Sequence, residues 1–120
     1  MRNGFLFAIW SAFQTDMHKL EILAEVLENV SNVTEVPVVD ILSRSRREED
    51  VTARILMIYC LVKKGLLPAQ VAELIGHTVH NIYRSLRIAE DRYRLSIGFR
   101  FDCDLICKQL GINCDLTSSR

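Results

Sequence analysis

Several signals that assign a protein class directly are missing from this chain of 120 residues. No stretch reaches the roughly 20 consecutive apolar residues that a membrane-spanning helix needs, so no membrane partner is expected. No GxxxxGK[ST] loop occurs, so we expect no bound nucleotide. The formal net charge is zero, which argues against coating nucleic acid or a membrane by bulk electrostatics. The 49% hydrophobic and 25% charged residues are typical of one ordinary globular domain.

Residues that commonly carry catalysis or bind metals are also scarce. There are three histidines, and no serine or cysteine is visibly placed with a base and an orienting group. The cysteines are Cys60, Cys103, Cys107 and Cys114, without the loop-rich composition of a disulfide-stapled domain. We expect reduced core thiols; a zinc site is the alternative, although no CxxC pair exists. We therefore predict no enzyme, no metal and no cofactor.

An apolar run occupies residues 4–13, after a single Arg2. It has the length of the apolar core of a secretory signal peptide, but no small-x-small cleavage site follows it. The other interpretations are a helix that packs on the core and an apolar flap that docks on a second copy, forming a homodimer. Because an exposed apolar run favours aggregation, we expect it to be covered. We assign residues 1–16 as an N-terminal leader or helix of a cytoplasmic protein.

Apolar residues at helical spacing predict the other elements. A helix with an acidic outer face begins near residue 17 and breaks at residues 31–34, and a short helix follows Pro37. Residues 48–64 have an acidic start, a basic end and apolar residues on more than one side, which predicts a central helix. A last helix ends at Gly111. The sequence thus predicts an all-α domain over residues 17–112 and a fraying tail at 113–120.

The stretch from residue 66 to residue 87 has the pattern of a helix-turn-helix. Pro68 fits the first position of a helix, and Gly76 fits a turn that needs φ > 0. Thr78 fits the N-cap of a second helix, in which Ile82 is buried against the first. These local signals agree with the apolar periodicity, which carries the second helix to about residue 95.

Positive charge is concentrated around this motif. Residues 1–43 contain two basic and six acidic residues, residues 44–100 contain eleven and six, and residues 101–120 contain two and three. The loop at residues 43–47 reads Ser-Arg-Ser-Arg-Arg. It is either a solvated connector or an arm that places guanidinium groups on phosphates or in a narrow minor groove. Arg54, within the central helix, is either a surface residue or directed at the same phosphates.

The N-terminal half of the second helix has a polar face. His80, Arg84 and Arg87 recur at helical spacing, flanked by His77 and Asn81. Donors and cations in this place are typical of a recognition helix that meets base edges and phosphates. The alternatives are a solvated polar face and, for the two histidines, a weak metal pair.

Three separated blocks resemble the C-terminal duplex-DNA-binding domain of the bacterial chromosomal replication initiator DnaA. They are DILSRSR at 40–46, ARILMIY at 53–59 and VAELIG at 71–76, where the family has DLLSKxR, ARQIAMY and IGxxFG. The resemblance covers about residues 20–110 and implies a Trp-repressor-like fold. It also implies that Arg46 enters the minor groove and that Arg54 holds a phosphate. The family's FGGRDHTTV is IGHTVHNI here, one residue shorter, with His80 and Asn81 in place of two threonines.

We therefore predict a non-enzymatic, sequence-specific binder of double-stranded DNA, acting as a replication accessory factor or a transcription regulator in a bacterium, phage or mobile element. The alternative is a protein-interaction or dimerisation module on the same scaffold. The predicted DNA contacts are His77, Thr78, His80, Asn81, Arg84 and Arg87 in the major groove, Arg44, Arg46 and Arg47 in the minor groove or on the backbone, and Arg54, Lys63 and Lys64 on phosphates.

Overall fold

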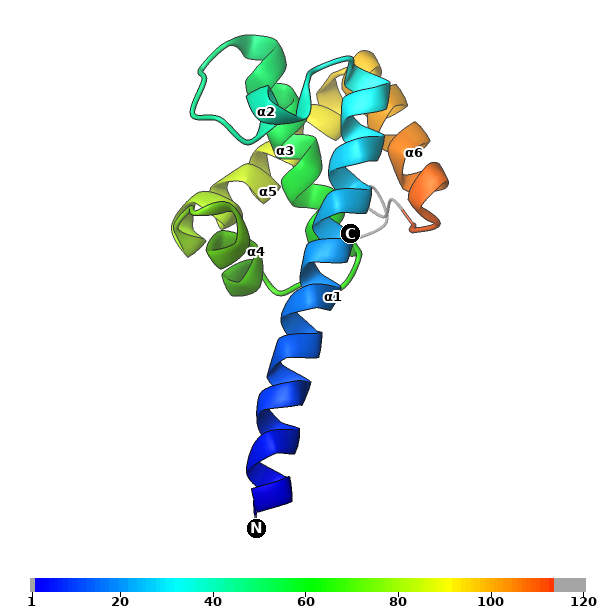
Figure 1. Ribbon diagram of the computed structural model, residues 1–120. Helices are drawn as coiled ribbons and strands as arrows, with labels where there is room; N and C mark the ends of the chain where they lie inside the picture. Colours follow the sequence, from blue (N-terminus) through cyan, green and yellow to red (C-terminus); the bar gives the residue numbers. More distant parts are fainter. Residues whose placement is uncertain (1, 114–120) are drawn as a thin grey trace.

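Helices make up most of the chain in the computed structural model, which describes the backbone of residues 2–113 and the side chains of residues 17–113 (Figure 1). Within these residues there are six helices and no strand, so the predicted all-α class is confirmed. Residues 114–120 of the predicted tail, including Cys114, lie outside the described residues. The helices are α1 (Arg2–Thr34), α2 (Val38–Ile41), α3 (Glu48–Lys63), α4 (Pro68–Ile75), α5 (Val79–Leu95) and α6 (Ile97–Leu110).

Helix α1 is one continuous helix of 33 residues. Residues 31–33, where the sequence predicts a break, remain helical, and the helix runs without interruption from residues 2–16 into the segment that follows residue 17. The Thr34 hydroxyl donates to the Val30 carbonyl oxygen at 2.7 Å, so the polar side chains in this stretch bond along the helix instead of ending it. The helix ends at Thr34, the last residue of the predicted break, and Glu35 follows with a φ of 63°.

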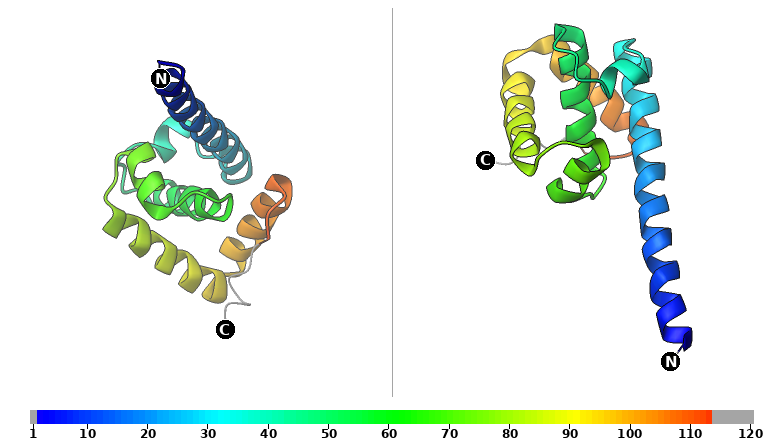
Figure 2. Two further views of the ribbon diagram at one scale, coloured as in Figure 1. Left: turned by 90° about the horizontal axis from the view of Figure 1, so that it is seen from below. Right: turned by 60° about the vertical axis from the view of Figure 1, so that its left-hand side comes forward.

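The N-terminal part of α1 extends away from the other helices (Figures 1 and 2). In this backbone, residues 4–13 do not lie against the other helices. No helix among the described residues combines the length and the apolar character needed to cross a membrane.

Helix α3 is the central element that the sequence predicts. It packs against α1, α2, α4 and α5, and α1 and α5 both also contact α6. Glu48 lies at its N-terminal end and Lys63 in its last turn, where each charge complements the helix dipole. Cys60, Cys103 and Cys107 are buried thiols, which confirms their predicted place in the core. The largest fully buried side chains include Val26, Val30, Ile41, Leu56, Met57, Ile58, Leu61, Val71, Ile82 and Ile106.

The predicted helix, turn and helix after residue 66 are present as α4, residues 76–78 and α5. Gly76 ends α4 with a φ of 73°, a conformation that strains any residue with a Cβ atom. The His77 N–H donates to the Ala72 carbonyl oxygen at 2.9 Å and closes the turn. The Thr78 hydroxyl oxygen then accepts the Asn81 N–H at 3.1 Å, as an N-cap does. Ile82 is fully buried, and α5 packs against α4.

Candidate nucleic-acid interface

The N-terminal half of α5 presents a polar face to solvent. Thr78, His80, Asn81, Arg84 and Arg87 are all exposed. No acidic residue occurs between residues 77 and 89, and the described side chains provide neither Arg84 nor Arg87 with a hydrogen-bond or ion-pair partner. Two guanidinium groups at this end of the helix are therefore available to an external anion.

The C-terminal half of the same helix is different. The Arg94 guanidinium bonds the Asp91 carboxylate at 2.7 Å, one turn earlier on the exposed face. Arg92 donates to the Thr52 hydroxyl at 2.8 Å and so ties α5 to α3. These cations are occupied by their own chain, and the available positive charge on α5 ends at Arg87.

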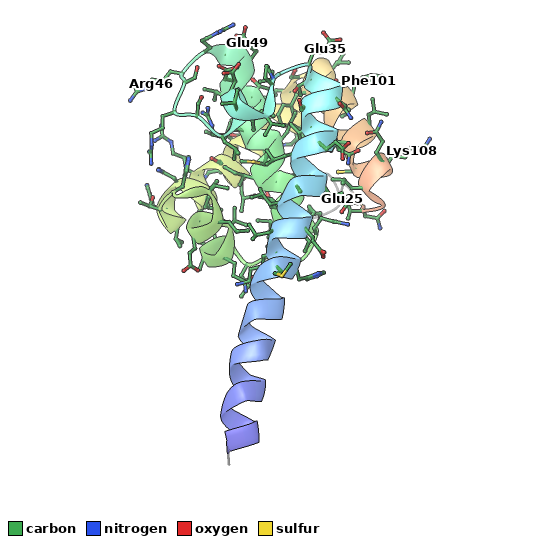
Figure 3. All side chains as sticks on the ribbon, viewed as in Figure 1. Glu25, Glu35, Arg46, Glu49, Phe101 and Lys108 are labelled. Carbon is green, nitrogen blue, oxygen red and sulfur yellow. The ribbon has the colours of Figure 1, made fainter. Side chains whose placement is uncertain are left out.

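The loop between α2 and α3 is held by its own serines. The Ser43 hydroxyl donates to the Asp40 carbonyl oxygen at 2.7 Å and accepts the Ser45 N–H at 3.1 Å. The Ser45 hydroxyl in turn accepts the Arg47 N–H at 3.2 Å. These short-range bonds between serine hydroxyls and the backbone shape the loop. Figure 3 shows Arg46 at its outer edge, and this residue is exposed without a described partner.

Arg44 connects this loop to the start of α5. Its Nη2 donates to the Gly76 carbonyl oxygen at 3.2 Å, across 32 positions of sequence. The loop at 43–47 and the turn at 76–78, which the sequence analysis identifies separately as DNA-contacting elements, are thus neighbours in space. Arg47 lies farther along the loop and forms an exposed ion pair with Glu49 at 3.1 Å, of a kind that contributes little to stability.

Arg54, for which a phosphate contact is predicted, forms hydrogen bonds within its own chain. Its Nε donates to the Ile41 carbonyl oxygen at 2.8 Å, its Nη1 to that of Ser45 at 3.1 Å and its Nη2 to that of Asp40 at 3.2 Å. Burial lowers the pKa of this guanidinium, and Asp50 acts in the opposite direction. Because the carbonyl oxygens at the end of α2 need donors, Arg54 serves them and holds the loop in place.

Lys63 and Lys64 are also placed differently from the prediction. The Lys64 Nζ lies 3.3 Å from a carboxylate oxygen of Glu25 on α1, and the Lys63 Nζ lies 5.9 Å from the centre of the Tyr59 ring. Both follow Arg54 by nine or ten positions, or about 14 Å along the axis at 1.5 Å per residue. They belong to the other end of α3 and not to the face formed by α5 and the loop.

His77 lies half-buried between the two elements. Burial lowers the pKa of its imidazole, and the nearby charges of Arg44 and Arg54 lower it further. The ring is therefore neutral at pH 7. It borders a hollow of about 260 Å³ between α3 and α5, whose lining residues are Val51, Arg54, Ile55, His77, Asn81, Arg84, Ser85 and Ile88.

The sequence analysis missed the anchoring roles of Arg44 and Arg54 and the burial of Asp50, which is 3% exposed. One signal was available, since Arg54 interrupts an otherwise apolar helix and therefore needs acceptors near it. Within the described residues, no group of three or more His, Cys, Asp or Glu side chains is arranged to hold a metal ion. No family model matches this chain, and no curated protein or solved structure matches it significantly.

Proposed function

We propose that this protein binds double-stranded DNA sequence-specifically, with the N-terminal half of α5 in the major groove and the loop at 43–47 on the adjacent backbone or minor groove. One observation carries this proposal. Two exposed cationic elements that are distant in sequence lie together through the bond from Arg44 to Gly76. Each presents arginines that have no described intramolecular partner, namely Arg46 in the loop and Arg84 and Arg87 on α5.

The proposal includes the arrangement of the fold. We propose that α4 and α5 act as a helix-turn-helix in a Trp-repressor-like domain, of the kind found at the C-terminus of the replication initiator DnaA. The order of α2, loop, α3, α4 and α5 and the three residue blocks named above support this assignment. The function would be that of a replication accessory factor or a transcription regulator.

The chemistry of the exposed side chains suggests separate tasks. An asparagine amide can pair with adenine N6 and N7, and an arginine with guanine O6 and N7. Asn81 and Arg84 have these groups near the start of α5, where a recognition helix meets base edges. Thr78 uses its hydroxyl oxygen as an acceptor within the chain, so its proton remains available to a phosphate. Arg46 suits a narrow minor groove, in which the negative potential is concentrated.

Selection from a random duplex pool, followed by fluorescence anisotropy on the selected site, tests the proposal. Arg46→Ala and Arg84→Ala should each weaken binding by about 5- to 150-fold, since one such contact provides roughly 1–3 kcal/mol. Arg94→Ala is the matched control, because it removes the same charge from an exposed position on α5 that is already paired with Asp91. It should change affinity less than about twofold.

The outcome that contradicts the proposal is equally specific. A pool without an enriched sequence, or an Arg84→Ala variant that binds as tightly as the unaltered protein, would reject sequence-specific reading by α5. Circular dichroism on each variant should give the same helix content, which separates lost contacts from lost folding.

A further inference from the structure

One exposed face of α1 has apolar residues where polar ones are expected. Met17 is 48% exposed and Leu20 54% exposed, and Ala24 is exposed as well. Their spacing of three and four places them on one face of the helix. The same spacing continues in the sequence on both sides of them. We call the set Leu6, Trp10, Phe13, Met17, Leu20 and Ala24 the apolar stripe. Leu27 continues the spacing, but it is only 7% exposed and already packs in the core of its own chain.

The core of this chain uses another face of α1. Ile22, Val26 and Val30 pack into the body of the molecule and are nearly or fully buried. The part of α1 that precedes residue 17 extends beyond that body, as Figure 1 and the right-hand view of Figure 2 show. An isolated helix of this length is marginal in water, and a long apolar stripe on it is an association surface. Its described members, Met17, Leu20 and Ala24, are therefore open to a partner.

The described part of the stripe is bordered by two hollows. One, of about 310 Å³, lies between α1 and α4 and includes Leu20 and Leu74 among its lining residues. The other, of about 380 Å³, lies between α1 and α2 and includes Ala24, Leu27 and Val38. Side chains of an apposed helix could enter both hollows, and their linings include apolar atoms on each side.

We infer that the partner is a second copy of this chain, with the two α1 helices antiparallel about a two-fold axis between Met17 and Leu20. This register sets Phe13 of each copy level with Ala24 of the other, a large residue against a small one. It sets Trp10 level with Leu27, at the larger hollow, and Met17 level with Leu20. When apolar residues recur at alternating intervals of three and four on two helices, the side chains of one helix pack between those of the other. Residues 10–17 of each copy thereby lie against residues 20–27 of the other, which border the two hollows.

This inference is independent of DNA binding and goes beyond it. The two-fold pairing uses the same surface on both copies, so it closes at a dimer. It also leaves α5 and the loop at 43–47 outside the interface, because neither contributes to the stripe or to its two hollows.

Sedimentation equilibrium on the full chain tests the inference, with Trp10 fluorescence as a second signal because it is the sole tryptophan. We expect twice the chain mass of 13.8 kDa at high concentration. Dilution should expose Trp10 and move its emission to longer wavelength. Ala24→Glu and Leu20→Glu should weaken dimerisation at least about tenfold, since each places a charge inside the interface. His18→Glu introduces the same charge at an exposed position of α1 off the stripe, and should leave the dimer intact.

A monomer at every concentration would overturn the inference, and so would an Ala24→Glu or Leu20→Glu variant that dimerises like the unaltered chain. Because Leu20 is more than half exposed, its substitution spares the core and answers the question if Ala24→Glu fails to fold. Vesicles of phosphatidylcholine and phosphatidylglycerol are the last arm. A Trp10 emission shift that depends on these vesicles and not on protein concentration would assign the stripe to a lipid surface instead.

Discussion

Both halves of α5 contain arginines, but only those of the second half have described partners within the chain. Arg84 and Arg87, in the first half, are exposed and have no described partner. Arg92 and Arg94, in the second half, bond side chains of their own chain. The number of arginines on a helix therefore says little about its attraction for an external anion. What decides is whether acceptors lie within reach of each guanidinium group.

The same contrast appears around the loop that adjoins α5. Arg46 extends from its outer edge, whereas Arg54 turns inward and donates to three carbonyl oxygens. Both residues match positions that the resemblance to the DnaA domain marks as DNA-contacting. The structure keeps one of them available and uses the other to hold the loop, so the two should respond differently to substitution.

The largest effect should come from removing both open arginines of α5. The double variant Arg84→Ala, Arg87→Ala should bind the selected duplex about 100-fold more weakly, because two contacts of roughly 1–3 kcal/mol are lost. Arg94→Ala should differ from the unaltered protein by less than about twofold. Fluorescence anisotropy at fixed salt measures both. An equal loss of DNA affinity in the two variants would show that the first half of α5 contributes no more to binding than the second half.

Salt provides an independent measure of the same contrast. If Arg46, Arg84 and Arg87 each neutralise one phosphate, log K should fall with log[salt] with a slope of about −2 to −3. Arg84→Ala should reduce the magnitude of that slope by about 1, whereas Arg94→Ala should leave it unchanged. An affinity that stays constant between about 50 and 200 mM salt is incompatible with phosphate contacts, because each such contact releases counterions and makes binding depend on salt.

Arg54→Lys should be the most destabilising of the conservative changes. A lysine keeps the charge but cannot serve three carbonyl oxygens from one planar group, so the free energy of unfolding should fall by about 2 kcal/mol. Urea denaturation measures it. Arg46→Lys, in the exposed part of the loop, is the control and should change stability by less than about 0.5 kcal/mol. Unaltered stability in Arg54→Lys would return this residue to the phosphate role that the sequence analysis assigns to it.

The elements of this fold were largely predictable, and the partners of its charges were not. Gly76 and Thr78 mark a helix end and a helix start by their own chemistry, and both marks are confirmed. Arg54 could not be assigned in the same way, because its acceptors lie 9 to 14 positions away and depend on how the loop folds. For Lys64, the deciding carboxylate is on α1, at Glu25. Long-range neighbours leave no periodic signal in a sequence.

Thr78→Ala should have a smaller effect on stability. The hydroxyl oxygen of Thr78 accepts the Asn81 N–H at the start of α5, and loss of such a cap costs about 1 kcal/mol. Thr78→Ser retains the acceptor and should recover most of that loss. Urea denaturation distinguishes the two variants, and hydrogen exchange at the Asn81 amide shows whether the loss is local. Equal stability of the alanine and serine variants would mean that the cap contributes nothing.

The smallest effect should be the contribution of His77 to the pH dependence of stability. Burial and two neighbouring arginines lower the pKa of this imidazole in the folded state, so at mildly acidic pH the unfolded chain binds more protons than the folded one. Stability should therefore fall as the pH drops below the unfolded value of about 6.5, and continue to fall until the folded imidazole also charges. His77→Gln removes this contribution and should flatten the urea midpoint between pH 7 and pH 5. Because burial and the two arginines lower the pKa of this imidazole, His77 should add less to DNA affinity between pH 7 and pH 6 than a fully exposed histidine would. A rise in affinity over that interval that disappears in His77→Gln would show that bound phosphate outweighs both arginines at this ring.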